Sequence, residues 1–211
     1  MNIIYEKKVA MTFIGFHTEI CPEEGYQKCP EFWDREYAAK YARLWQTMKP
    51  ENPVEAAILS NGIGMFAICS ESGNGFEYWI AGLYQGGKVP EGLELYTFPA
   101  SDWALFTTKG PIPDSIQALN TYVWQEWFPS EGIKRRANGK ATIEVYSAGD
   151  PQAPDYESGI WVPLQEAKMS LYHGKYHHSY QDHLLHCITI LSIPLHSLLY
   201  SVCNRGDHRY N

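Results

Sequence analysis

The sequence lacks the short motifs that mark nucleotide-dependent enzymes and serine hydrolases. It contains no GxxxxGK[ST] phosphate-binding loop, no GxGxxG dinucleotide fingerprint and no GxSxG nucleophile elbow. Only five of the 211 residues are cysteines. Their number is odd and none has the CxxC spacing of a zinc or redox motif. These absences argue against the commonest nucleotide-binding, hydrolytic and zinc-binding classes.

Two further absences bear on location and partners. Residues 1–10 (MNIIYEKKVA) contain no apolar core of a secretory leader, so we expect a cytoplasmic protein with reduced thiols. Positive charge is scarce, because 17 Lys and Arg stand against 24 Asp and Glu, a net charge of −7. Such a surface repels phosphate backbones, which argues against direct nucleic-acid binding and favours cationic small molecules or basic partners.

Large aromatic side chains are abundant, with seven Trp and fifteen Tyr. Apolar residues make up 45% of the chain and charged residues 19%, a composition that supports a sizeable core and excludes wholesale disorder. Aromatic residues in this number either fill a core or line a ligand cavity. Composition alone leaves both interpretations open.

Hydrophobic periodicity predicts the same order of elements twice. In the first half, a strand and a helix precede further strands, at residues 8–16, 31–48, 64–70, 76–85 and 93–98. In the second half, a strand and a helix precede two closing strands, at residues 103–109, 114–128, 142–146 and 159–164. No sequence repeat accompanies this duplication. We therefore predict an α+β fold of tandem strand-helix-strand-strand halves, with two helices packed on one face of an antiparallel sheet.

Residues 98–164 carry the most specific pattern. A strand ends in a Gly-Pro pair, a Trp-rich helix follows, and the strand TIEVY sets one acid, Glu144, among residues that favour strands. After an Asp-Pro turn come Glu157 and the segment IWVPL. This order resembles the GyrI-like effector-binding domain, which occurs at the C-terminus of bacterial AraC-type and MerR-type multidrug regulators and as a free-standing protein. The resemblance covers residues 1–166, without a helix-turn-helix, and so implies a stand-alone member.

The resemblance implies a groove between the two halves, in which a glutamate and aromatic walls capture lipophilic cations. Glu144 matches that glutamate, and Glu157 matches a second acid near the pocket. Alternate residues of a strand share a face, so Tyr146 lies beside Glu144. Ile143 and Val145 point the other way, toward the face that we expect the helices to cover. The further candidates for the aromatic walls are Trp79, Tyr84, Trp103, Phe106 and Trp161.

The residues alone leave plainer alternatives for each candidate. An acid on a strand is more often exposed to solvent than buried, which applies to Glu144 and to Glu157. Any one of the aromatic residues is as well explained by ordinary core packing. Only the match to the family pattern favours a ligand site over these alternatives.

Composition changes after Lys168. Residues 169–211 hold seven of the eight histidines, some spaced as in zinc sites, but no HExxH accompanies them. We predict neither a metal nor a cofactor. The apolar run at 184–202 is interrupted by two histidines and a proline, so we expect no membrane span. We accordingly divide the chain into an effector-binding domain at 1–166 and a His-rich extension at 167–211.

The leading functional prediction is a binding module for amphipathic, cationic small molecules, serving drug sensing or sequestration rather than catalysis. The resemblance also implies two alternatives known among free-standing GyrI-like proteins. One is hydrolysis of cyclopropanoid alkylating compounds with Glu144 as the general base. The other is an interaction with DNA gyrase, and a separate transcription-regulatory protein is a further conceivable partner.

Overall fold

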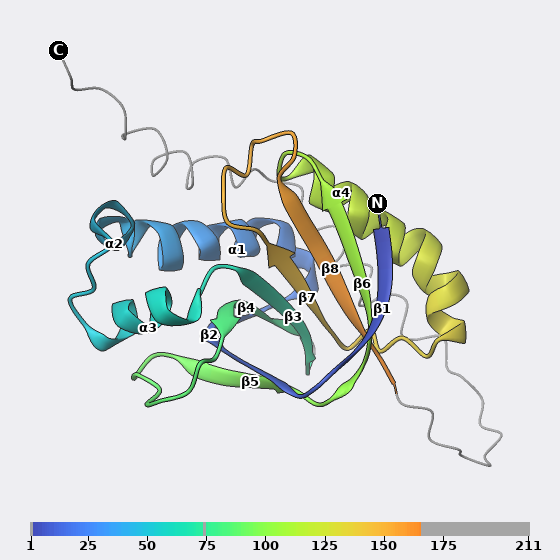
Figure 1. The fold of residues 1–211 in the computed structure, drawn as a ribbon, viewed down its shortest axis with the longest axis horizontal. Helices are drawn as coiled ribbons and strands as arrows, with labels where there is room; N and C mark the ends of the chain where they lie inside the picture. The colour runs from blue at the N-terminus through green and yellow to red at the C-terminus, as the bar shows by residue number, and fades with distance from the viewer. Residues whose placement is uncertain (1, 74, 166–211) are drawn as a thin grey trace.

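Eight antiparallel strands form one sheet, against which several helical segments pack (Figure 1). The structure is a computed structural model that describes residues 2–73 and 75–165. The predictions made for residues 167–211 therefore lie outside the described residues. The strands are β1 (Asn2–Lys8), β2 (Met11–Ile20), β3 (Phe66–Ser72), β4 (Gly75–Leu83), β5 (Glu94–Phe98), β6 (Ser101–Lys109), β7 (Ala141–Tyr146) and β8 (Glu157–Leu164).

The helical segments follow β2 and β6 in the chain. After β2 come a short 3₁₀ turn, two α-helices separated by a π-helical stretch, and a third α-helix: η1 (Pro22–Glu24), α1 (Gly25–Phe32), η2 (Trp33–Ala39), α2 (Ala42–Thr47) and α3 (Pro53–Asn61). After β6 come α4 (Asp114–Tyr122) and the π-helical η3 (Val123–Gly132), which continue one another. The predicted α+β class, with an antiparallel sheet and packed helices, is confirmed.

The strand order across the sheet is β1-β6-β8-β7-β3-β4-β2-β5. Read outward from the central β3–β7 pair, one side runs β3-β4-β2-β5 and the other runs β7-β8-β6-β1. Strands in corresponding places are therefore β3 and β7, β4 and β8, and β2 and β6, with β5 and β1 at the two edges. Figure 1 shows the helices that follow β2 at one end of the molecule and those that follow β6 at the other.

The structure corrects two predicted elements. The strand predicted at residues 8–16 corresponds to β2, which begins at Met11 and continues to Ile20, and the edge strand β1, which ends at Lys8, was not predicted. The helix α3 was not predicted, because a proline shortly after a helix, such as Pro53 after the helix predicted at 31–48, is an ordinary sign that the helix has ended. Proline also suits the first turn of a helix, and the Asn52 side chain caps α3 by accepting a hydrogen bond of 2.9 Å from the Glu55 backbone N–H.

Both faces of the sheet are buried, which the sequence analysis did not anticipate. One face packs against the helices, where Trp33, Leu44 and Val123 belong to the same buried cluster as sheet residues. The opposite face carries a second buried cluster made of strand residues only, which we call the second core: Phe13, Ile68, Trp79, Ala81, Phe98, Trp103, Leu105, Ala141 and Ile143. The sheet therefore curves so that strands of its two sides meet across this face.

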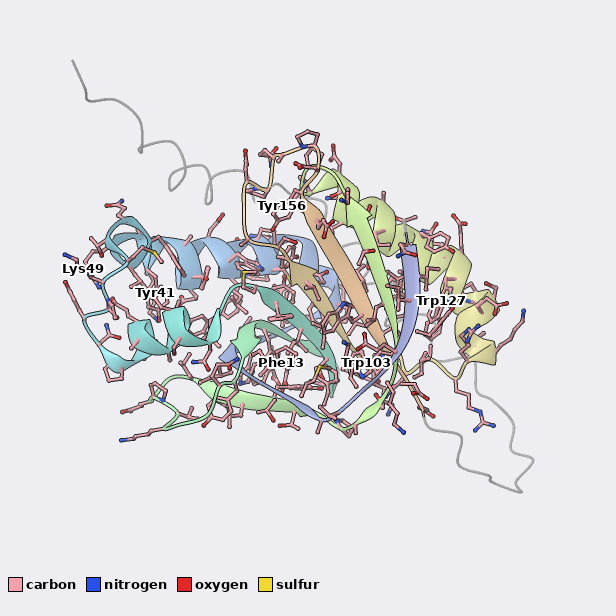
Figure 2. The ribbon with its side chains drawn as sticks, in the orientation of Figure 1. Phe13, Tyr41, Lys49, Trp103, Trp127 and Tyr156 are labelled. Carbon is pink, nitrogen blue, oxygen red and sulfur yellow. The ribbon has the colours of Figure 1, made fainter. Side chains whose placement is uncertain are left out.

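A closed ring of five aromatic side chains defines the second core. Successive ring centroids lie between 5.2 and 6.5 Å apart, from Phe13 through Phe66, Trp161, Trp103 and Phe98 back to Phe13. Each contact is edge-on, the arrangement that the aromatic quadrupole favours. Figure 2 shows Phe13 and Trp103 where the strands of the two sides approach one another, and Tyr41 and Trp127 beside the helices.

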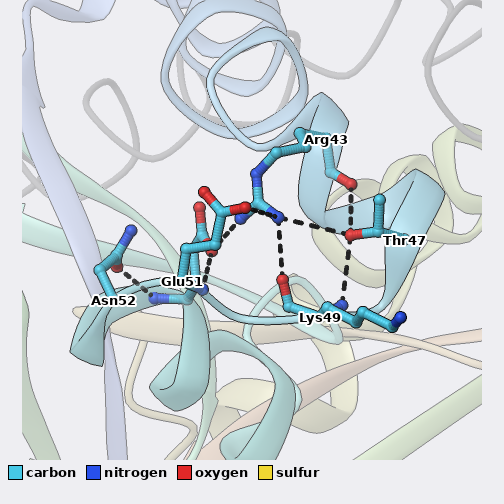
Figure 3. Close-up of polar contacts among 6 residues, drawn as sticks. Arg43, Thr47, Lys49, Glu51 and Asn52 are labelled. Atoms are coloured by element: carbon cyan, nitrogen blue, oxygen red, sulfur yellow. Dashed lines mark hydrogen bonds and ion pairs between the residues drawn. The ribbon is translucent and has the colours of Figure 1, made fainter.

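An arginine joins α2 to the start of α3 (Figure 3). The Arg43 guanidinium lies 3.0 Å from a Glu51 carboxylate oxygen, pairs with the Glu55 carboxylate and donates 2.9 Å to the Lys49 carbonyl. The Glu51 backbone N–H donates 2.7 Å to Glu55. The hydrogen bond from Arg43 lowers the pKa of Glu55 and raises that of Arg43. This network fixes the connection between the two helices.

We expect Arg43→Met to lower the melting temperature at pH 7 by several degrees, because it leaves the buried Glu55 carboxylate without its cationic partner. The folded-state pKa of Glu55 is depressed, so the stabilisation is present above the unfolded pKa and is lost as the pH falls through the folded one. Thermal unfolding at pH 7 and pH 3 measures both effects. Lys134→Met is the control, since Lys134 pairs with an exposed Glu131. Equal melting temperatures for the two variants would contradict the prediction.

Candidate ligand-binding site around Glu144

Glu144 lies near the centre of the sheet, on β7 between β3 and β8. Its register partners are Ala67 on β3 and Ile160 on β8, both buried. Tyr146, two residues along the same strand, belongs to the cluster that packs against the helices, whereas Ile143 belongs to the second core. Glu144 therefore faces the helices, half-buried.

This placement corrects the face assignment made from the sequence. The pattern of β7 predicted that Ile143 and Val145 would lie under the helices and that Glu144 would point away from them. That argument assumed a single covered face. Because the curved sheet buries its other face as well, the apolar residues of β7 pack into the second core, and the acid lies on the helix-covered side.

The Glu144 carboxylate is held by a tyrosine and lies in aromatic surroundings. The Tyr146 hydroxyl donates a hydrogen bond of 2.8 Å to Oε2 of Glu144. The ring of Trp33, from η2, lies edge-on to that of Tyr146 with centroids 6.3 Å apart, and its Nε1 donates 2.9 Å to the Tyr78 hydroxyl on β4. Three elements distant in sequence thus bring two tyrosines and a tryptophan to one acid.

Among the residues that the structure describes, Glu144 is a desolvated acid without a counter-charge. Burial raises its pKa to about 7, although the hydrogen bond from Tyr146 opposes the shift. Burial also raises the pKa of Tyr78 well above its usual value, and the charge of Glu144 adds to that effect. Within residues 2–73 and 75–165, no Lys, Arg or His forms an ion pair with Glu144. An external cation would supply the missing charge.

The structure does not bring most of the other sequence-predicted residues to Glu144. Phe106 lies in the helix-covered cluster, fully buried, with its ring 4.8 Å from that of Trp127. Tyr84 lies just beyond β4, and its hydroxyl donates to the Gly87 carbonyl. Glu157 is exposed at the start of β8 and pairs with Lys109 at 2.8 Å.

The three predicted wall tryptophans belong to the opposite face. Trp79 and Trp103 are buried in the second core, and Trp161 packs against it. The Trp161 ring also receives the Lys8 ammonium at 4.6 Å from its centroid. These side chains are separated from the Glu144 carboxylate by the sheet itself.

Sequence reasoning missed Trp33 and Tyr78 as neighbours of the acid. Trp33 lies within the helix predicted at residues 31–48 and Tyr78 within the strand predicted at 76–85, and neither was a site candidate. The register that joins β4 through β3 to β7 is what carries Tyr78 toward Glu144, and no local pattern encodes it. The available signal was that Tyr78 and Trp79 are adjacent in a strand, so that their rings must lie on opposite faces of the sheet.

Neither a metal centre nor a membrane-spanning helix is found in the part of the chain that the structure describes. No three His, Cys, Asp or Glu side chains come together there in a way that could hold a metal ion. None of the described helices is both long enough and apolar enough to cross a bilayer.

The eight-stranded antiparallel sheet with its packed helices defines a domain of the α+β class. The chain matches the model of the Cass2 family, integron-associated effector binding proteins, over residues 4–164. It belongs to that family, and the resemblance to GyrI-like effector-binding domains is thereby confirmed.

Individual relatives agree with this assignment. The transcriptional regulator BrlR of Pseudomonas aeruginosa is 28% identical over 129 residues, which cover 58% of this chain and 45% of BrlR. The chain thus spans less than half the length of that regulator. The structure of SAV2435 bound to tetraphenylphosphonium matches with a TM-score of 0.60 at 19% identity, covering 79% of this chain and 95% of that one.

A second solved structure shows the same fold. A putative transcription regulation protein of Staphylococcus aureus MU50 matches with a TM-score of 0.58 at 18% identity, over 78% of this chain and 99% of its own. At these identities both structural matches establish the fold alone.

Proposed function

We propose that this chain binds amphipathic organic cations in a groove on the helix-covered face, between the two halves of the sheet, with Glu144 as the charge partner. The observation that carries the proposal is the half-buried Glu144 carboxylate, which has a tyrosine donor but no cationic partner among the residues that the structure describes. The tetraphenylphosphonium in the SAV2435 structure and the regulator BrlR support it by analogy. The role in the cell is drug sensing or sequestration.

The physics of the site favours a large, soft cation. A carboxylate withdrawn from water costs several kcal/mol, and a bound cation recovers much of that cost. A delocalised positive charge is itself weakly hydrated and gains about 0.5–2 kcal/mol from each aromatic face that it contacts. Trp33, Tyr78 and Tyr146 are the aromatic side chains around the acid. A site made of one charge and several aromatic rings imposes few constraints on ligand shape, so we expect it to bind a broad range of organic cations.

Two ions of nearly equal size and opposite charge test the proposal directly. Titration calorimetry at pH 8 should show saturable binding of tetraphenylphosphonium and binding of tetraphenylborate that is weaker by about a hundredfold or more. Both ions present the same four phenyl rings, so a difference reports the sign of the charge. Equal affinities would contradict the proposal.

We expect the affinity for tetraphenylphosphonium to rise with pH. The pKa of Glu144 is about 7 and the cation binds the ionised form, so affinity at pH 6 should be about tenfold below that at pH 8. Titrations between pH 5.5 and 8.5 measure the profile. Glu144→Gln should give a flat profile, and a pH-independent wild type would contradict the assignment.

The raised pKa of Glu144 also predicts how the stability of the fold depends on pH. The folded pKa of Glu144 is raised from 4.5 to about 7. The stabilisation of the folded state by the protonated carboxyl group is therefore fully present below the unfolded pKa and is lost as the pH rises through the folded pKa. Glu144→Gln should therefore be more stable than the wild type at pH 8, by at most about 3 kcal/mol, and nearly equal at pH 4.5. Urea unfolding at both pH values measures the difference.

A raised pKa near neutrality also favours a second candidate function, activation of water by Glu144 as a general base. The corresponding reaction is hydrolytic opening of a cyclopropanoid ring: water attacks one ring carbon and forms a C–O bond, the ring C–C bond at that carbon breaks, and the displaced electron pair takes up the proton that the water loses. Mass spectrometry of such a compound after incubation would show a product heavier by one water. An unchanged compound that still quenches tryptophan fluorescence would identify a binder without this activity.

A further inference from the structure

A cavity lies at the end of the second core, where its lining includes Phe98 and Ala141 of that core and Leu164 of the helix-covered cluster. Its volume is about 1120 Å³, slightly above the usual range for small-molecule sites, roughly 300–1,000 Å³. It is lined by the ends of β3, β5 and β8, the turn between β5 and β6, and the segment between η3 and β7. The Glu144 site does not use any of these residues.

The cavity has an apolar floor and a polar wall. Phe98, Ala141 and Leu164 are buried apolar residues in its lining. Ser70 on β3 and Tyr96 on β5 also line it, and their hydroxyls are hydrogen-bonded to each other at 2.9 Å. An occupant thus meets apolar surface and hydroxyl groups together, which suits an amphipathic molecule.

The charged part of the lining is mainly positive. It contains Arg136, Lys140 and the single acid Glu71, whose carboxylate lies 4.0 Å from the Lys140 ammonium. The Arg136 side chain is exposed and forms no ion pair with any residue that the structure describes. A guanidinium binds a carboxylate through two parallel hydrogen bonds, so Arg136 is the natural partner of an anionic head group.

The backbone around Arg136 is fixed to the sheet. The Arg136 carbonyl accepts a hydrogen bond of 2.9 Å from the Gln165 N–H, and the Asn138 N–H donates 2.7 Å to the Pro163 carbonyl. Ala137 forms a β-bridge with Leu164 between these two bonds. The arginine is therefore presented by an ordered segment, and binding does not have to order that backbone first.

We propose that this cavity is a second ligand site, which binds amphipathic carboxylates with the apolar chain on the Phe98 side and the carboxylate on Arg136. It is independent of the cation site, because the two sites share no residue and their charges are opposite. The proposal does not depend on the function proposed for Glu144.

Two probes with the same chain and opposite head groups separate the sites. Decanoate and decyltrimethylammonium, both below their micellar concentrations, are titrated calorimetrically into the full chain and its variants. Decanoate should bind saturably, and Arg136→Gln should weaken it about tenfold, because Gln keeps one amide donor but loses the positive charge and the second parallel hydrogen bond. Arg135→Gln is the matched control, since that guanidinium stacks over the Tyr5 ring and does not line the cavity.

A steric variant complements the charge variant. Ala100 is an exposed residue of the cavity lining, in the turn between β5 and β6, so Ala100→Trp should block decanoate and leave the fold intact. Glu144→Gln should leave decanoate binding within twofold of the wild type, whatever it does to decyltrimethylammonium. The proposal is overturned if decanoate does not saturate, if Arg135→Gln weakens it as much as Arg136→Gln, if Ala100→Trp leaves it unchanged, or if Glu144→Gln abolishes it.

Discussion

Glu144→Gln is expected to weaken tetraphenylphosphonium binding at pH 8 by about a hundredfold, and binding of neutral triphenylphosphine oxide by less than about threefold. Gln has nearly the same shape as Glu and accepts the same hydrogen bond from Tyr146, so the aromatic surroundings are retained. Only the cation gains from the negative charge. Calorimetric titration of the two ligands into both proteins measures the ratio of the losses.

The chain offers a matched control for this substitution. Glu157 is the second acid that the family resemblance implied, and the structure shows it exposed and paired with Lys109. Glu157→Gln removes the same charge from the same fold, and we expect less than about a twofold change for either ligand because exposed charges are screened. Equal losses of both ligands in Glu144→Gln would mean that the acid supports packing. A comparable loss in Glu157→Gln would move the charge recognition away from Glu144.

The sequence predicted the order of the elements because each element has its own local signal. The helix that contains Trp33 and Leu44 has an apolar stripe, and in the strand that contains Glu144 the acid stands between two β-branched residues. These signals do not depend on the rest of the chain. The edge strand β1 was missed because its sequence, NIIYEKK, does not alternate between apolar and polar residues. The helix α3 was missed because its proline also marks the end of a preceding helix.

Which face of the sheet holds the site was not predictable from such signals. Alternation along β7 separates Ile143 from Glu144, but it does not say which face the helices cover. The decision depends on packing between segments that are distant in sequence, such as Phe66 on β3 against Trp161 on β8 across the second core. That contact is made between opposite sides of the sheet. The same non-local packing explains why Tyr78 was missed as a neighbour of Glu144.

Trp103 provides the sharpest test of this two-core arrangement. It was a predicted ligand-wall residue, yet it is fully buried in the ring of five aromatic side chains, 5.2 Å from Phe98 and 6.5 Å from Trp161. We expect Trp103→Ala to lower the free energy of unfolding by about 3–5 kcal/mol, because it removes a large buried side chain and leaves a cavity. Urea unfolding at pH 7 measures the loss.

Trp103→Phe separates packing from ligand binding. Its smaller ring keeps most of the aromatic contacts. It also removes an indole N–H that is buried without a hydrogen-bond partner among residues 2–73 and 75–165, so the two effects on stability partly offset each other. We expect this variant to fold and to bind tetraphenylphosphonium within about twofold of the wild type, because the sheet separates residue 103 from Glu144. A loss of affinity in Trp103→Phe as large as in Glu144→Gln, with stability preserved, would place the cation against the second core. The helix-covered face would then not be the binding face.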